Sequence, residues 1–338
     1  MFNNRTRNQH FIAQVEQKLN AIDPTVDKDK RRIYEFEISD REKLNYAITN
    51  SAGVKIENNL SFYDLYTFDV FSDETRNNFE KFFQKYESKI EVYTNRFLEK
   101  MQKKEKISKE ELFDLIFCKI MNLIRNPFSV IKVLNTLGSL AEVKPTDPNL
   151  LREFDKIEKS NLKVDDETLK LLNISDDQFV KWLKVIFNFF AVEIDGKSLG
   201  ELTVQNFSNN SKVYINVFSY KKEVCLLSDR GYVDYSPGFE NSAFSMSFNL
   251  NKNNFLNFSF FEISWDNFKK ITPHVLPMIE TLQKSGVDIK TLFKPEIEVA
   301  TTKFECLEAL ENYNSNALVQ CHNNVYCAEE KFKVWRQD

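Results

Sequence analysis

Glycine and proline are scarce in this chain of 338 residues, which has 7 glycines and 8 prolines. Such a composition argues against a collagen-like chain, a loop-dominated scaffold and a glycine-rich fold that cradles nucleotides. The sequence also lacks the glycine-rich phosphate loop, the dinucleotide-binding fingerprint and the Gly-x-Ser-x-Gly nucleophile elbow. ATPases, dehydrogenases and hydrolases that depend on those motifs are therefore disfavoured.

Long apolar runs and paired cysteines are also missing. No apolar stretch reaches the roughly 18 residues that a membrane-spanning helix requires. The polar start, Met1–Arg5, lacks the apolar core of a secretory signal. The 5 cysteines are odd in number and scattered, which is typical of reduced thiols rather than of a disulfide framework. These features predict a cytoplasmic protein without a membrane partner.

Aromatic residues, by contrast, are plentiful. The 31 phenylalanines and a hydrophobic content of 42% are sufficient to build a sizeable core. The net charge of -4 provides no general attraction to nucleic acid or to anionic membranes. Two basic stretches, 28–32 and 100–109, contain interleaved acids and are typical of solvated faces. Nucleic-acid binding without chemistry is therefore the weakest of the functional hypotheses.

A strong helical pattern follows Ser72, Asp73 and Glu74, which are typical of a helix start. Six large side chains recur at spacings of four and three, namely Phe79, Phe83, Tyr86, Ile90, Tyr93 and Phe97. The pattern predicts a helix that runs to about Lys104 with one aromatic stripe. We favour packing of this stripe inside the chain. The alternative is a partner protein or homo-oligomer that docks on the helix over 79–97.

Local start signals predict further helices. Ser108 with Glu111 and Ser175 with Gln178 fit capping boxes, and Asp147-Pro148 places a proline in a first helical turn. Residues 131–140 are another candidate helix. After Trp265 the pattern is again helical, with breaks at two prolines, Pro273 and Pro277.

Alternation of apolar and polar residues predicts strands. One strand lies near 32–38, two more lie at 213–218 and 223–227 with a turn near Lys221 and Lys222, and two further strands cover 244–250 and 255–261 on either side of an Asn-rich turn. We therefore predict an α+β fold in a single domain over 1–338. A helical bundle-like layer over about 72–190 would pack on a mainly antiparallel sheet, with C-terminal helices. A soft boundary near 190 is the alternative.

Polar residues at the ends of apolar elements are the candidate site residues, because a scaffold commonly presents its chemistry there. Histidine transfers protons near neutral pH, carboxylates hold divalent ions, and arginine neutralises phosphate charge. On these grounds the candidate catalytic residues are His10, Tyr63, Asp64, Arg125 and Asp229. Each has a structural alternative, as a cap, a turn residue or a member of a buried network.

A zinc site is a weaker hypothesis. Cys321, His322 and Cys327 offer three ligands within seven residues, and Cys306 is the nearest fourth candidate. Structural zinc usually draws on two separated ligand pairs, and this spacing fits no standard knuckle. A partly buried thiol cluster is therefore the favoured interpretation.

Several islands of sequence occur in a characteristic order, over roughly residues 8 to 262. They are Gln9-His10-Phe11-Ile12-Ala13, Arg32-Ile33-Tyr34-Glu35-Phe36, Phe62-Tyr63-Asp64, Arg125-Asn126-Pro127 and Cys225-Leu226-Leu227-Ser228-Asp229-Arg230-Gly231. The order resembles the bacterial family named Domain of Unknown Function 4238, whose islands resemble Gln-His-Tyr-Val-Pro and Thr-Ser-Asp-Asn-Pro. Ala13 and Arg230-Gly231 depart from that pattern. The resemblance implies a divergent member with a shared fold and a shared site, and it implies no reaction.

Two main functional hypotheses follow. The first is a metal-dependent phosphodiesterase or nuclease that acts on nucleic acid or a nucleotide, as a toxic effector in anti-phage defence. His10 would move a proton, Asp64 and Asp229 would hold Mg or Mn, and Arg125 would stabilise phosphate charge. The alternative is a non-enzymatic sensor or protein-interaction module in which the polar islands are buried networks that fix the fold.

Overall fold

The computed structural model describes residues 2–72, 75–159, 166–209, 211–235, 243–262, 297–299 and 303–335. In that part of the chain the α-helices are α1 (Gln14–Leu19), α2 (Glu80–Lys103), α3 (Lys109–Arg125), α4 (Val130–Leu137), α5 (Pro148–Lys159), α6 (Asp166–Leu172), α7 (Asp176–Ala191), α8 (Leu199–Asn209) and α12 (Leu307–Gln320). Short 3-10 helices are η1 (Lys28–Lys30), η2 (Ile56–Asn58), η3 (Pro127–Ser129) and η4 (Gly138–Glu142).

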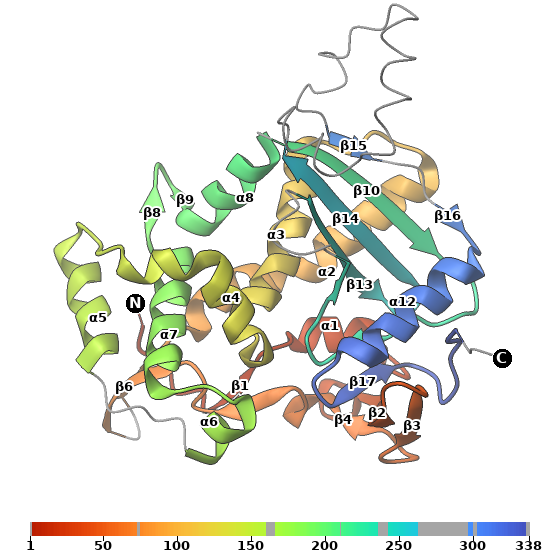
Figure 1. Ribbon diagram of the computed structural model, residues 1–338, viewed down its shortest axis with the longest axis horizontal. Coiled ribbons are helices and arrows are strands. Elements are labelled where there is room, and N and C mark those ends of the chain that lie inside the picture. Colours follow the sequence, from red (N-terminus) through yellow and green to blue (C-terminus); the bar gives the residue numbers. More distant parts are fainter. Residues whose placement is uncertain are drawn as a thin grey trace, which may run out of the picture.

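The larger sheet is mainly antiparallel and has the strand order β12-β13-β14-β10-β15, with β16 also paired to β10 (Figure 1). Its strands are β10 (Ser211–Ser219), β12 (Val233–Asp234), β13 (Ala243–Asn251), β14 (Asn254–Glu262), β15 (Ile297–Val299) and β16 (Lys303–Phe304). β15 and β16 run parallel to β10. The hairpin of β13 and β14 turns at Asn251–Asn254, as the sequence predicts.

A second, antiparallel sheet joins the two ends of the described chain. Its order is β11-β17-β2-β3, and β4 pairs with β2. The strands are β2 (Arg32–Asp40), β3 (Asn45–Ile48), β4 (Val54–Lys55), β11 (Leu227–Ser228) and β17 (Asn324–Cys327). Three two-stranded ribbons complete the strands, β1 (Asn8–His10) with β5 (Ser61–Tyr63), β6 (Thr67–Ser72) with β7 (Thr75–Asn78), and β8 (Glu193–Ile194) with β9 (Lys197–Ser198).

The helical layer packs on one face of the larger sheet. Successive strand residues point to opposite faces, so Val217 and Leu256 join the same apolar core as the helices, while Phe218 and Phe255 face α12. α12 thus lies on the other face of this sheet (Figure 1). It also contacts β12. Within the described residues no helix is long and apolar enough to cross a membrane.

The aromatic stripe of α2 lies inside the molecule. Phe79, Phe83, Tyr86, Ile90 and Phe97 are buried, and Tyr93 packs against the same core. Tyr86, for example, lies 4.8 Å from Phe117 of α3 and 6.0 Å from Phe190 of α7, measured between ring centroids. The intramolecular interpretation of the stripe is therefore confirmed.

Several helix starts match their sequence signals. Both predicted capping boxes form. The side chains of Ser108 and Ser175 each accept the backbone N–H three residues on, and their own backbone N–H groups donate to the side chains of Glu111 and Gln178. Asp147 accepts the backbone N–H groups of Asn149 and Leu150 at the start of α5. α4 begins at Val130, within one residue of its predicted start.

The α+β class is confirmed, and three details differ from prediction. α2 begins at Glu80 instead of Ser72, because residues around Ser72 belong to the β6–β7 ribbon. The strand near 32–38 is β2 of the second sheet, where it pairs with β17. Residues 223–227 form no hairpin with β10, since β14 and β15 occupy both of its edges. The helical prediction after Trp265 falls largely outside the described residues.

Candidate functional site

His10 ends the short strand β1 and is held by neighbours from two other segments. Its Nε2 lies 3.0 Å from the carbonyl oxygen of Glu57 and 3.1 Å from Nε2 of Gln14. Burial lowers the pKa of His10, and the positive charge of Arg125 lowers it further. The imidazole is therefore mostly neutral at pH 7, with its Nε2 already engaged by protein groups.

Tyr63 and Asp64 end β5 on the same ribbon but differ in environment. Tyr63 is 62% exposed. Asp64 is buried, has a left-handed φ of 53°, and accepts the hydroxyl of Thr67 at 3.1 Å. The backbone N–H of Thr67 also donates to the Asp64 carbonyl, at 3.0 Å. The Asp64 carboxylate thus stabilises the turn that leads into β6.

Arg125, the last residue of α3, is fully buried in an ion-pair network. Its guanidinium donates to the carboxylate of Glu87 on α2 and, at 3.0 Å, to the side-chain oxygen of Asn122. The guanidinium carbon also lies 5.1 Å from the centroid of the Phe83 ring. A buried charge of this kind is stabilised only by a close opposite charge, so Arg125 binds α3 to α2.

The same network continues to α1. Asn122 donates its amide to one oxygen of Glu16 at 2.6 Å, and Lys119 donates to the other oxygen at 2.5 Å. Glu16 and Lys119 are both buried. All these groups come from helices that pack together, and each charge faces an opposite charge. The arrangement fixes the helices relative to one another.

Asp229 follows β11 and binds the loop between α12 and β17. Its two carboxylate oxygens accept the backbone N–H groups of His322, Asn323 and Asn324, at 2.7, 2.7 and 2.9 Å. Burial raises the pKa of Asp229, and these three hydrogen bonds act against that rise. The Asp229 side chain therefore determines where the His322 loop lies.

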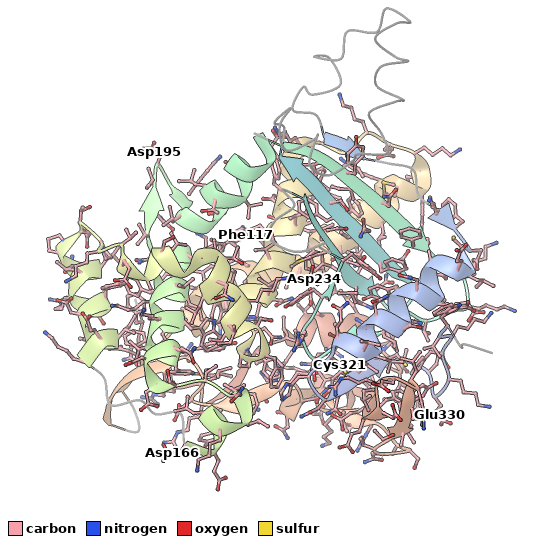
Figure 2. All side chains as sticks on the ribbon, in the orientation of Figure 1. Phe117, Asp166, Asp195, Asp234, Cys321 and Glu330 are labelled. Carbon is pink, nitrogen blue, oxygen red and sulfur yellow. The ribbon has the colours of Figure 1, made fainter. Side chains whose placement is uncertain are left out.

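A pocket of about 640 Å³ lies beside that loop. Four segments of the chain supply its lining, which is formed by Phe128, Ile131, Lys132, Leu171, Leu172, Asn173, Arg230, Tyr232, Asp234, Gln320 and His322. In Figure 2 the labelled Asp234, in the lining, and Cys321, which adjoins His322, lie close together near the C-terminal end of α12. The volume falls within the range of about 300–1,000 Å³ that is typical of small-molecule sites.

Two positively charged side chains, Arg230 and Lys132, line the pocket. The Nε of Arg230 is buried and has no hydrogen-bond partner among the described residues. Lys132 forms an ion pair with Asp234, whose backbone N–H and carbonyl are both bonded by the Gln320 side chain. A buried N–H without a partner costs about 1–3 kcal/mol. The charged Arg230 side chain also lines the pocket, where it would attract an anionic ligand.

His322 is the titratable group of the pocket nearest neutral pH. Its ring stacks on Phe128, with 4.1 Å between centroids and 10° between planes. Burial lowers the pKa of His322, the Asp229 carboxylate acts against this shift, and the Arg230 charge adds to it. The imidazole is therefore neutral at pH 7 and able to accept a proton.

The structure connects the predicted islands through their backbones. The Tyr66 hydroxyl donates to the Arg125 carbonyl at 2.7 Å, and the Asn126 amide donates to the Asp229 carbonyl at 2.8 Å. The side chains of His10 and Asp229, however, bond to different groups, at Glu57 and at residues 322–324. The islands meet as a structural network, and the pocket lies at the Asp229 end.

Sequence reasoning singled out Arg230 only as the neighbour of Asp229, and His322 only as a zinc ligand. Lys132, Tyr232 and Gln320 were missed, because no local pattern links residues from α4, β12 and α12. The adjacency of arginine to a predicted strand-end carboxylate was the one usable signal for this site.

The thiols near Cys321 are buried. Burial raises the pKa of both Cys321 and Cys327 to about 12. Among the described residues no group of three or more His, Cys, Asp or Glu side chains is arranged to hold a metal ion. The Mg or Mn hypothesis at Asp64 and Asp229 stays a prediction.

Comparison of the chain with protein-family models, with curated proteins and with solved structures finds no match. The resemblance to Domain of Unknown Function 4238 stays a prediction.

Proposed function

We propose that this protein binds a phosphate-bearing ligand, a nucleotide or a phosphodiester, in the pocket of Arg230 and His322, and hydrolyses it. The observation that carries the proposal is a pocket lined together by the Arg230 and Lys132 side chains and by the His322 imidazole. Guanidinium groups match the oxygens of phosphate, and their hydrogen bonds to an anion are roughly twice as strong as neutral ones.

The neutral imidazole of His322 supports the hydrolytic step. It would take a proton from a water molecule that attacks phosphorus and return that proton to the departing oxygen. Arg230 and Lys132 would stabilise the negative charge that develops on the phosphate oxygens. Asp229 would act as a positioning residue, because it holds the backbone of the His322 loop. Since its oxygens already accept three amides, no step of this proposal passes through a metal ion at Asp229.

The second candidate is a sensor that binds the same class of ligand without turnover. The observation that favours it is the internal pairing of the other predicted catalytic groups. Arg125 pairs with Glu87, Asp64 bonds Thr67, and Asp229 bonds the backbone. Those groups serve the fold, which leaves fewer candidates for chemistry. The role as a toxic effector in anti-phage defence would suit either candidate and stays a prediction.

Purified protein tests both candidates. Binding of mononucleotides would be measured by calorimetry, and hydrolysis of bis(p-nitrophenyl) phosphate, nucleotides and RNA would be followed over time. We expect Arg230→Ala to weaken binding about 10–100-fold and His322→Gln to abolish hydrolysis while the fold persists. His10→Gln and Arg152→Ala are the matched controls, because both lie outside the pocket lining.

The outcomes separate the candidates. Binding without hydrolysis of any substrate would establish the sensor. Hydrolysis that is lost in His10→Gln but kept in His322→Gln would move the active site to the β1–β5 ribbon. If no phosphate compound binds or reacts, both candidates are wrong.

A further inference from the structure

The pocket has two chemically different sides. Its polar residues include Arg230, Lys132 and His322, and its apolar residues are Phe128, Ile131, Leu171 and Leu172. Phosphate alone needs only the polar side. The second, apolar side therefore requires an explanation, and it narrows the class of ligand.

The apolar side remains open to solvent. Ile131 of α4 is 44% exposed and Leu171 of α6 is 46% exposed, although both line the same pocket. Exposed apolar residues that gather from separate elements at one pocket are typical of a ligand site. The neighbouring ring pair of Phe128 and His322 adds a flat aromatic section to the wall. Flat and apolar surfaces of this kind bind planar rings by stacking and by removal of water.

The amount of positive charge also limits the ligand. Two cationic side chains, Lys132 and Arg230, line the pocket, and Lys132 already faces Asp234. A strand of nucleic acid is bound along a positively charged groove that follows successive phosphates, and its affinity falls steeply with salt. The positive charge of this pocket is sufficient to bind one phosphate group but not a chain of phosphates.

We propose that the pocket takes a mononucleotide or a closely related small nucleotide, with the base against Ile131 and Leu171 and the phosphate at Arg230. The inference rests on the proposed function, which requires a phosphate-bearing ligand in this pocket. It adds that a ring is required for tight binding, and that the ligand is a single small molecule instead of a polymer.

A binding series by calorimetry tests this inference. The probes are AMP, GMP, CMP and UMP, with adenosine, ribose 5-phosphate, inorganic phosphate and a single-stranded RNA 12-mer for comparison. We expect at least one mononucleotide to bind about tenfold more tightly than ribose 5-phosphate, because the base adds stacking and apolar contact. The RNA should bind more weakly than that mononucleotide.

Variants separate the two sides of the pocket. Leu171→Ser should weaken binding of the mononucleotide about 3–10-fold and leave ribose 5-phosphate unchanged, since only the ring contacts the apolar side. Arg230→Ala should weaken binding of both. Ile194→Ser is the matched control, because Ile194 is an exposed apolar residue, at 51%, outside the pocket lining.

Different results would overturn different statements. Ribose 5-phosphate and every mononucleotide could bind with equal affinity, and Leu171→Ser could leave these affinities unchanged. That result would reject base binding on the apolar side but leave the proposed phosphate site intact. Tighter, strongly salt-dependent binding of the RNA would reject the small-molecule ligand. If none of the phosphate compounds binds, the proposed function itself is wrong. If adenosine binds as tightly as AMP and Arg230→Ala has no effect, the phosphate side is wrong.

Discussion

Two arginines at the ends of regular elements lie in contrasting environments. Arg125 is fully buried at the end of α3, where Glu87 and Asn122 accept from its guanidinium. Arg230 follows β11, lines a pocket of about 640 Å³, and has a buried Nε with no partner among the described residues. The Nε of Arg125 also lacks such a partner, but Arg125 does not line that pocket.

The difference teaches what a polar residue at an element end can mean. A charge removed from water needs an opposite charge nearby, and when the protein supplies it, the pair fixes the fold. A charge that the protein leaves partly unsatisfied at a pocket is available to a ligand. Local sequence looks similar in the two cases, because the deciding partner lies elsewhere in the chain.

The largest expected effect concerns the paired arginine. Arg125→Ala should lower the free energy of unfolding by about 3–5 kcal/mol, because it leaves Glu87 without its partner and opens a cavity. Arg230→Ala should change it by less than about 1 kcal/mol. Urea unfolding of the two variants measures the contrast. Equal losses of stability would show that Arg230 is also a structural residue.

The next effect is a pH dependence within the same helical region. Burial raises the pKa of Glu80 on α2 to about 8, and the negative charge of Glu87 adds to the rise. The folded protein thus retains a proton that the unfolded chain releases above its ordinary value of 4.5. The stability that Glu80 contributes is present below that value and is lost as pH rises through about 8.

Glu80→Gln removes this titration. The variant should show about 2–4 kcal/mol less loss of unfolding free energy than the wild type between pH 5 and pH 9. Glu99→Gln, on the exposed side of α2, is the control and should match the wild type. Urea unfolding at both pH values provides the measurement. Parallel curves for Glu80→Gln and the wild type would mean that Glu80 is hydrated.

A smaller effect links the two regions through Asp229. Asp229→Asn keeps one oxygen but replaces the other with a donor, so some of the amides at 322–324 lose their acceptor. We expect a loss of about 1–3 kcal/mol in stability, together with weaker binding in the pocket because His322 shifts. Asp195→Asn is the control, on the exposed turn of β8 and β9 labelled in Figure 2. Unchanged binding with lowered stability would separate Asp229 from the site.

The smallest effect is expected at His10. Burial and the Arg125 charge lower its pKa, so the unfolded chain binds a proton more readily than the folded protein. The resulting stability is present above the ordinary value of 6.5 and is lost as pH falls below it. His10→Gln should reduce the change of stability with pH below 6.5 without affecting ligand binding in the pocket. Thermal melting of the variant and the wild type between pH 5 and pH 7 checks the first statement, and calorimetry with a mononucleotide checks the second.

Much of the helical region could be predicted from sequence, because its signals are local. The capping boxes at Ser108 and Ser175 depend on residues three positions apart, and the stripe on α2 depends on helical spacing. Strand pairing was harder to predict from the sequence. Nothing near Ile33 indicates that its strand would pair with β17 instead of with β10, because pairing depends on distant residues.

The candidate site was harder still to predict from the sequence. Asp229 was identified from its position after a strand, but its partners are backbone groups at 322–324, which no side-chain pattern records. His10 was selected because it is a histidine in a polar island, and its environment could be known only from Glu57 and Gln14. A pocket assembled from four distant segments exists only in the folded chain.

The pairing of β2 with β17 has a consequence for the order of events during synthesis. The hydroxyl of Tyr326 donates to Glu35 across 291 positions of sequence, so this sheet cannot close until the chain has been made as far as Tyr326. Gln320 and His322, which line the pocket, directly precede that last strand. Since contacts of such long range form late, a ribosome-bound chain would carry only part of its pocket. Ligand binding would begin only after the residues of β17 have been synthesised.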